Sequence, residues 1–385
     1  MIPSGIYIHI PFCIAKCHYC DFYSQTDCYH LVPSYFEALS EEVDTVLNNA
    51  HIEARIKTQL KAQTIFIGGG TPSSVDASYI QRIVNKCISA FNINVDGSTE
   101  ISIEANPGTI SKEKLSAYAS CGINRLSIGL QSSDDRILSY IGRIHNSEDY
   151  VKSMEYAQKS GFKNINTDLI YSLPGQTEQS FEESLSLAVS AGSTHISCYS
   201  LELHEGTVLF NSLAGGSLFD SSALPDDEFD RKLYWKAVEF LTERGFKHYE
   251  ISNFALPGYE CRHNINYWKT GTYIGLGAGA HSYFNGKRYS NDDSIESYIN
   301  HKPYILHEII TTEEAQKEFM LLGLRLIEGI DYAEFYQRFG QDCRSVFAAS
   351  IDKIILNGLV MENNGRLFLS NKGLDLANQV FMEFI

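Results

Sequence analysis

The chain has 385 residues, which is enough for roughly two or three domains. It carries 31 lysine and arginine residues against 47 aspartate and glutamate residues, so its formal net charge is −16 at pH 7. Because an acidic protein repels phosphate backbones, this charge opposes nucleic acid as a general partner. Apolar residues form 44% and charged residues 20% of the chain, a composition that is typical of folded proteins and excludes a disordered one.

The sequence predicts a cytoplasmic protein without an integral membrane segment. No apolar run reaches the roughly 20 residues that a membrane-spanning helix needs, and residues 1–5 contain no basic start of a secretory leader. Peripheral contact with a membrane stays open, and so does the choice between monomer and homodimer. Nine cysteines are present, and all but three are scattered singly, which argues against a disulfide framework.

The first 225 residues alternate between β-rich runs and helix-like segments. The predicted strands are residues 5–10, 64–67, 99–104, 125–128, 164–169 and 195–199. Apolar residues recur every three or four positions in the predicted helices, which are residues 33–48, 77–91, 112–121, 147–160 and 179–191. This alternation favours an α/β fold with parallel strands, and right-handed crossovers would roll six strands into a partial (β/α)6 barrel over 1–225. An open doubly wound sheet is the alternative, and in both folds ligands bind at the carboxyl ends of the strands.

The pattern changes after residue 225. A helix is predicted over 226–244, a strand over 248–254 and a glycine-rich passage over 275–282, and we interpret 226–305 as a linking region. From residue 306 to 385 the sequence predicts three helices, a hairpin at Asn363-Asn364-Gly365 and a final helix. Since Asn-Gly between short apolar runs is a strong hairpin signal, this part is predicted to be a small winged-helix-like α+β module.

Three cysteines lie together in a loop after the first predicted strand. Cys13, Cys17 and Cys20 have the spacing C-x-x-x-C-x-x-C. Structural zinc normally has four protein ligands, and no fourth cysteine follows nearby. An iron-sulfur cluster fits better, because three thiolates can bind three irons and leave one iron open for S-adenosylmethionine. Zinc completed by His18 or by a distant residue, or a chance grouping, is the alternative.

This cysteine spacing resembles the radical S-adenosylmethionine superfamily, in which it holds a 4Fe-4S cluster. The whole chain resembles the coproporphyrinogen III oxidase-like branch, and within it the HemW heme chaperones. The run Tyr-Ile-His-Ile-Pro-Phe-Cys at residues 7–13 carries that resemblance. The resemblance implies a radical S-adenosylmethionine barrel with a 4Fe-4S cluster held by the three cysteines.

The resemblance also implies a set of residues that contact S-adenosylmethionine at the mouth of the barrel. These are Tyr7, Gly69, Gly70, Thr71, Glu104, Gln131, Arg143 and Asp168. Their chemistry suits the ligand, since an arginine can hold a carboxylate through two hydrogen bonds and an aspartate can accept from ribose hydroxyls. Taken singly, the glycine run also fits a tight turn, and the polar residues also fit helix caps or surface ion pairs.

Two departures separate this chain from the coproporphyrinogen III dehydrogenases. Those enzymes carry another cysteine two residues after the motif, where this chain has Phe22, and they have a long extension before the first strand. The HemW signature H-N-x-x-Y-W is present as His263, Asn264, Tyr267 and Trp268. An imidazole beside aromatic rings is a credible neighbour of heme, whereas an ordinary core turn is the alternative.

The resemblance therefore implies a chaperone that binds heme as its cargo and passes it to apo-hemoproteins such as respiratory enzymes. His263, Asn264, Tyr267 and Trp268 are the candidate heme-binding residues, with His281 and Cys261 as weaker ones. The alternative is oxidative decarboxylation of coproporphyrinogen III to protoporphyrinogen IX, and a different radical reaction is a third hypothesis. We expect a chaperone without this oxidase activity, and the sequence identifies no catalytic residue.

Overall fold

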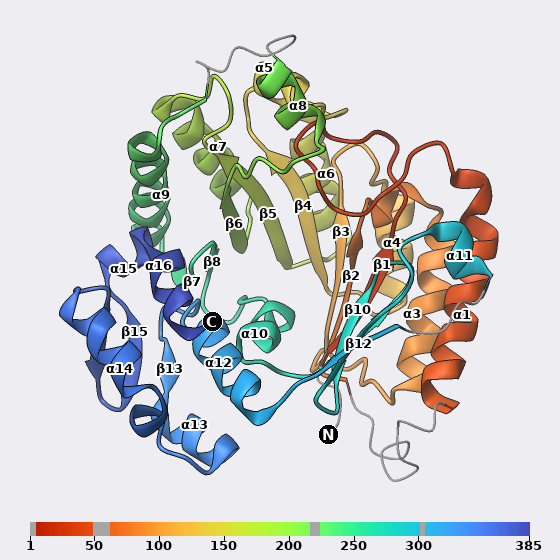
Figure 1. Cartoon of the computed structure of the whole chain (residues 1–385). Coiled ribbons are helices and arrows are strands. Elements are labelled where there is room, and N and C mark those ends of the chain that lie inside the picture. The colour runs from red at the N-terminus through yellow and green to blue at the C-terminus, as the bar shows by residue number, and fades with distance from the viewer. Residues whose placement is uncertain (1–4, 49–61, 216–223, 301–304) are drawn as a thin grey trace.

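The structure is a computed structural model that describes residues 5–48, 62–215, 224–300 and 305–385. Residues 1–4, which contributed to the prediction of a cytoplasmic location, lie outside these ranges. The core of the fold is a curved sheet with helices on its outer side (Figure 1). Six parallel strands form its centre in chain order: β1 (Gly5–Ile10), β2 (Thr64–Gly69), β3 (Glu100–Ala105), β4 (Arg125–Gln131), β5 (Asn164–Tyr171) and β6 (His195–Ser200).

The order of these strands confirms the predicted partial barrel. Neighbours in the sheet are neighbours in the chain, and the order does not reverse as it does in a doubly wound sheet. The helices between them are α1 (Val32–Asn48), α3 (Ala77–Ala90), α4 (Lys112–Ser120), α5 (Asp135–Tyr140), α6 (Ser147–Lys159) and α7 (Glu178–Ser190). No helix within the described ranges is long and apolar enough to cross a membrane.

Alternation along β1 shows how the sheet separates its two faces. Ile6, Ile8 and Ile10 are fully buried in the hydrophobic core with residues of α1. Since successive side chains point to opposite faces of a strand, Tyr7 and His9 lie on the other, concave face. The concave face thus carries polar and aromatic side chains, and the outer face carries the apolar ones that pack against the helices.

The segment that we interpreted as a linking region supplies strands to both edges of the same sheet. At one edge the structure has β7 (Lys247–Glu250) and β8 (Asn253–Ala255), where the sequence analysis predicted one strand over 248–254. At the other edge lie β9 (Tyr273–Leu276), β10 (His281–Phe284), β11 (Lys287–Ser290) and β12 (Ile305–Ile309). The glycine-rich passage therefore belongs to a hairpin beside β1 rather than to a connection, while the domain boundaries at 225 and 305 stay predictions.

Close backbone contact explains why a glycine begins this passage. Gly275 of β9 pairs with Tyr7 of the parallel strand β1. A Cβ atom on Gly275 would lie 2.0 Å from the backbone oxygen of His281, so β10 can approach only because this side chain is missing. Such a contact between distant residues is invisible to local periodicity.

The remaining helices link these edges to the C-terminal part. They are α8 (Val208–Gly215), α9 (Asp227–Thr242), α10 (Arg262–Trp268) and α11 (Ile295–Ile299). In the C-terminal part lie α12 (Thr312–Gly323), β13 (Ile330–Asp331), α13 (Tyr332–Phe339), α14 (Cys343–Leu356), β14 (Val360–Asn363), β15 (Arg366–Leu369), α15 (Asn371–Asp375) and α16 (Ala377–Phe381). Asn363 pairs with Arg366, and both Asn364 and Gly365 have positive φ, so the predicted hairpin and its two-residue turn are confirmed.

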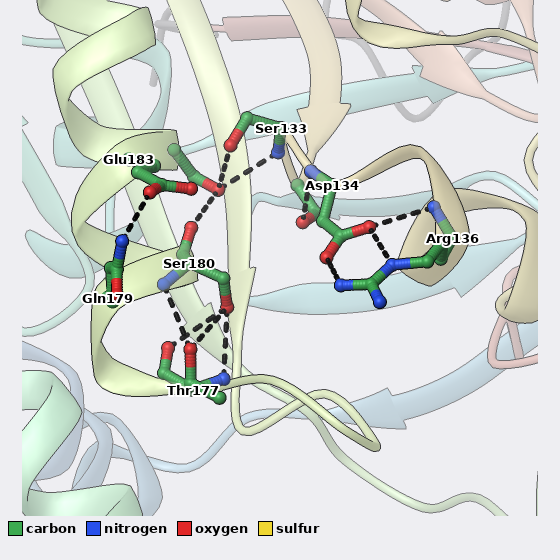
Figure 2. Close-up of polar contacts among 9 residues, drawn as sticks. Ser133, Asp134, Arg136, Thr177, Gln179, Ser180 and Glu183 are labelled. Atoms are coloured by element: carbon green, nitrogen blue, oxygen red, sulfur yellow. Dashed lines mark hydrogen bonds and ion pairs between the residues drawn. The ribbon is translucent and has the colours of Figure 1, made fainter.

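Hydrogen bonds fix the starts of α5 and α7, which follow the carboxyl ends of β4 and β5 (Figure 2). Asp134 caps α5 by accepting from the backbone N–H of Arg136, and it also pairs with that guanidinium at 2.8 Å. Thr177 and Ser180 form a reciprocal capping box at the start of α7. The backbone N–H of Ser133 donates to Ser184 of α7 over 2.9 Å, which fixes the segment after β4.

Candidate functional site

The cysteine loop starts at the carboxyl end of β1 and is held by backbone hydrogen bonds. Cys13 is buried, while Cys17 and Cys20 are partly exposed. The N–H of Cys13 donates to the carbonyl of Gln25 over 2.9 Å, which closes the loop on itself. The N–H of Thr71, just after β2, donates to the carbonyl of Phe12 over 2.8 Å. The loop therefore has a defined position at the end of the barrel where the sequence predicted the site.

Glycines at the end of β2 leave room for the atoms of this loop. A Cβ atom on Gly70 would lie 3.0 Å from Sγ of Cys13, and one on Gly69 would lie 2.7 Å from the ring of His9. Gly69 also has a φ of 115°, which favours glycine. The hydroxyl of Thr71 lies 3.4 Å from Sγ of Cys13. Gly69, Gly70 and Thr71 thus lie next to the cysteine loop. The space left by the missing side chains of Gly69 and Gly70 is occupied by atoms of His9 and of the cysteine loop.

Arg143 joins three parts of the site. Its Nη2 donates to the side-chain oxygen of Asn106 and to the carbonyl of Gly129, both over 2.7 Å, and Nη1 lies 3.5 Å from Sγ of Cys17. Its Nε is buried without a hydrogen-bond partner among the described residues. Asn106 was not singled out from the sequence. Its place directly after β3, at the carboxyl end of a parallel strand, is the signal that could have identified it.

A small pocket lies beside this guanidinium. Its lining combines residues of the cysteine loop with residues that follow β2, β3 and α5: Ile14, Ala15, Cys17, Thr71, Asn106, Thr109, Gly142, Arg143 and Ile144. Three residues from the predicted site, Cys17, Thr71 and Arg143, therefore share one hollow.

Two partly buried carboxyl groups lie on the concave face of the sheet. Glu104 accepts a hydrogen bond of 3.2 Å from the backbone N–H of Gly69. Burial, followed by repulsion from Asp168, raises the pKa of Glu104 to about 8. Asp168 accepts from Ser127 over 3.0 Å and from Asn166 over 2.8 Å, and burial raises its pKa too. A cationic ligand in this place would favour the charged form of Glu104, which suits the sulfonium and ammonium groups of S-adenosylmethionine.

Gln131 and Tyr7 complete the set that the sequence predicted. Gln131 ends β4 with a φ of 69°, next to a register shift that follows Gly129. A Cβ atom on Gly129 would lie 2.8 Å from Nε2 of Gln131 and 3.1 Å from Nη2 of Arg143, so this glycine makes room for both side chains. Tyr7 lies deeper on β1, where its hydroxyl is 3.0 Å from Nδ1 of His9. A strained polar residue at a strand end is typical of a binding site.

The signature helix α10 lies at the opposite end of the strands. His263 is 1% exposed, and its Nδ1 lies 2.8 Å from the hydroxyl of Thr64, the first residue of β2. Its Nε2 lies 2.9 Å from the hydroxyl of Tyr267. Burial, followed by repulsion from the nearby Arg125, lowers the pKa of His263 to about 3. The structure does not bring this histidine to the cysteine loop, and both ring nitrogens already have partners.

The other residues of the H-N-x-x-Y-W signature lie on α10, whose start is anchored by a buried glutamate. Glu100 accepts from the backbone N–H groups of Arg262 and His263 over 3.0 and 3.1 Å, which anchors the start of α10. Asn264 and Trp268 are partly exposed on the same helix. The ring of Trp268 packs under the guanidinium of Arg325 at 4.4 Å, and its buried Nε1 has no hydrogen-bond partner among the described residues.

The cysteine donor set fits a cluster better than a single ion. Within the described ranges, no three His, Cys, Asp or Glu side chains converge closely enough to hold one metal ion. A 4Fe-4S cluster binds each thiolate through a different iron, so its ligands need not converge on one point. Nε of Arg143 is buried without a hydrogen-bond partner among the described residues, so it would suit the carboxylate of a ligand.

Known proteins match the chain over its whole length. The family described as the radical SAM superfamily matches residues 7–188, and the HemN C-terminal domain matches residues 310–376. The heme chaperone HemW of Bacillus subtilis is 36% identical over 388 residues, which cover 99% of this chain and 99% of that protein. The heme chaperone HemW of Escherichia coli is 31% identical, over 96% of this chain and 97% of that protein.

A solved structure supports the same fold. The coproporphyrinogen III oxidase HemN of Escherichia coli, described as a radical SAM enzyme, superimposes with a TM-score of 0.83 over 100% of this chain and 90% of its own. At 23% identity this similarity shows the fold alone. Together with the relatives that match end to end, it confirms the resemblance found in the sequence. The chain belongs to the HemW family, within the radical S-adenosylmethionine superfamily.

Proposed function

We propose that this protein is a heme chaperone, which binds heme and transfers it to apo-hemoproteins such as respiratory enzymes. One observation carries the proposal: the chain is 36% identical, from end to end, to a protein named heme chaperone HemW. The acidic charge agrees with a protein partner rather than nucleic acid. We further propose a cytoplasmic location, a monomer or homodimer, and at most peripheral contact with membranes.

Membership of the superfamily implies a 4Fe-4S cluster and S-adenosylmethionine. In our proposal Cys13, Cys17 and Cys20 hold the cluster, and Thr71 orients the first of these thiolates through its 3.4 Å contact. When bound, such a cluster supplies one-electron chemistry at an iron that is open to S-adenosylmethionine. The thiols are supplied by a loop that β2 and α5 hold in place, so binding needs little rearrangement of the backbone.

The remaining predicted residues would hold the nucleotide. We propose that Arg143 binds the carboxylate of S-adenosylmethionine with its unpartnered Nε, and that Glu104 faces the cationic end. Asp168 would accept from ribose hydroxyls in place of its present partner Ser127. We propose that Tyr7, Gly69, Gly70 and Gln131 complete the set of residues that contact S-adenosylmethionine.

Oxidation of coproporphyrinogen III is the second candidate, because the HemN oxidase shares the fold with a TM-score of 0.83. The residue at the position of the additional cysteine argues against it. Phe22 follows the cluster loop with 66% of its surface exposed, and it supplies neither a thiol nor a proton. We therefore infer that the chain uses its barrel for binding and not for this decarboxylation.

The experiment is an anaerobic titration of the reconstituted full-length protein with heme, followed by the Soret absorption band. A parallel sample receives coproporphyrinogen III, S-adenosylmethionine and a reductant. We expect saturable heme binding near one heme per chain and no protoporphyrinogen IX. Enzymatic conversion of coproporphyrinogen III without heme binding would reject the chaperone and establish the oxidase.

A further inference from the structure

Most histidines of the described ranges already use their ring nitrogens within the protein. His9 binds the hydroxyl of Tyr7 and the carbonyl of Tyr23, and His195 binds Asn166 and Tyr249. His281 at the start of β10 is different. It is exposed, and its ring nitrogens make no hydrogen bond with any described residue. Iron of heme is bound by a neutral imidazole with an accessible nitrogen, so His281 meets a requirement that these buried histidines do not.

The strand register places His281 on the concave face of the sheet. Tyr7 pairs with Gly275, and Tyr273 pairs with Tyr283 across the β9–β10 hairpin. Side chains alternate along a strand, so His281 and Tyr283 share a face with Tyr273 and Tyr7. In the sheet, β9 lies between β1 and β10. Gly275, which pairs with Tyr7, has no side chain, and the backbone of His281 lies against it.

Aromatic rings on this face provide a surface that suits a porphyrin. Tyr7, Tyr273 and Tyr283 are partly exposed, and so is Tyr267 of the adjacent helix α10. The rings of Tyr267 and Tyr273 meet edge to face at 4.7 Å, and the ring of Tyr283 has the guanidinium of Arg288 at 5.8 Å. Flat apolar ligands gain affinity by packing on aromatic side chains. The strands β9 and β10, which carry Tyr273 and Tyr283, follow β1 in the same sheet.

His307 is a second imidazole beside His281. The two rings are nearly parallel, with centroids 5.8 Å apart, although the residues lie on β12 and β10. His307 differs in that its Nε2 lies 2.6 Å from the hydroxyl of Ser290. Partial burial, His307 and Arg288 all lower the pKa of His281, which keeps its ring neutral near pH 7. Partial burial is the main cause, so the neutral ring of His281 does not depend on His307 alone.

We propose that His281 is the ligand of the heme iron, and that the cargo lies against Tyr7, Tyr273 and Tyr283 on the concave face. This inference rests on the proposed heme-binding function and names the site within it. It replaces His263 as the iron ligand, because His263 is 1% exposed and would first have to leave Thr64 or Tyr267. It also puts heme on the strand β1 that leads into the cysteine loop.

The test compares His281→Ala with the wild type in a heme titration of the full-length, reconstituted protein. We expect the affinity of the variant for heme to fall at least roughly tenfold, which corresponds to about 1.4 kcal/mol. We also expect a shifted Soret band. Added imidazole should restore the wild-type band, since it supplies the missing ligand. His281→Met, which offers another iron ligand, should bind heme with an altered spectrum.

Two controls make the outcome specific. His30 is exposed in the short helix Tyr29–Leu31, so His30→Ala should leave heme binding unchanged. His307→Ala should keep the band of histidine-bound heme. Wild-type affinity and spectrum in His281→Ala, or loss of the band only in His263→Gln, would overturn the assignment while the chaperone proposal stands. Failure of the wild type to bind heme would instead reject the chaperone proposal.

Discussion

Nη1 of Arg143 lies 3.5 Å from Sγ of Cys17, while Nη2 of the same side chain donates to the carbonyl of Gly129 over 2.7 Å. One guanidinium therefore connects the cysteine loop to the end of β4. Because an arginine fork holds two partners at fixed angles, a change at Arg143 affects the ligand site without removing a thiol. This arrangement separates the roles of cluster ligand and nucleotide ligand, and each can be tested alone.

We expect Arg143→Ala to lower the affinity for S-adenosylmethionine roughly tenfold or more, since a charge-assisted hydrogen bond contributes about 1.5 to 3 kcal/mol. The iron content should stay at the wild-type level. Equilibrium dialysis of anaerobic protein measures the affinity. Arg136→Ala is the matched control, because Arg136 is 92% exposed on the neighbouring helix α5. Equal losses in both variants would contradict a specific role for Arg143.

Alanine at any one of Cys13, Cys17 and Cys20 should abolish the stable 4Fe-4S cluster. The expected result is loss of the visible absorption of the cluster and of most bound iron after reconstitution. Cys28 is a nearby buried cysteine outside the motif, so Cys28→Ala should retain both. Four bound irons in the Cys17→Ala variant would show that this thiolate is not a ligand.

The partly buried Glu104 predicts a pH dependence of stability. Its pKa is raised from 4.5 to about 8, mainly by burial, so the folded chain keeps a proton that the unfolded chain loses near pH 4.5. The free energy of unfolding should therefore fall as the pH rises from 4.5 to 8, by roughly 3 to 5 kcal/mol at 1.4 kcal/mol per pKa unit. Glu104→Gln should lack this loss. Urea unfolding at pH 5 and pH 8.5 without S-adenosylmethionine measures this difference in the free energy of unfolding. An equal difference in the wild type and in Glu104→Gln would show that Glu104 does not cause it.

The anchor of the signature helix gives a stability prediction. Glu100 is 4% exposed and accepts from two backbone N–H groups at the start of α10. Glu100→Gln should lower the free energy of unfolding by roughly 2 to 4 kcal/mol, because it weakens a buried charged acceptor. Glu113, exposed in the first turn of α4, is the control, and Glu113→Gln should change stability by less than about 0.5 kcal/mol. Similar small effects in both variants would contradict the anchoring role.

Local sequence patterns predicted the central fold well. The strand over residues 5–10 and the hairpin at Asn364 and Gly365 have the bounds and the turn that periodicity and turn chemistry indicated. The edges of the sheet were missed. The pairing of Gly275 with Tyr7 joins residues far apart in the chain, and one predicted strand over 248–254 is a hairpin. Both depend on long-range contacts that periodicity does not contain.

In the candidate site, too, local patterns predicted some features and missed those that depend on long-range contacts. Strand ends placed the cysteine loop, the glycine run and Glu104 at one end of the barrel, as the fold class requires. Asn106 was missed because an asparagine after a strand has no distinctive spacing, although Arg143 makes it part of the site. The sequence also did not predict that His263 lies at the opposite end of the strands. A sequence motif identifies the residues of a helix but does not show where that helix packs in the fold.

Heme transfer tests the central claim most directly. The full-length protein is loaded with heme, separated from free heme, and mixed with a heme-free respiratory enzyme while the activity of that enzyme is followed. We predict that activity returns faster than with the same concentration of free heme, and that His281→Ala, which loads poorly, supports less recovery. Heme that stays on the protein, or recovery no faster than with free heme, would contradict a chaperone.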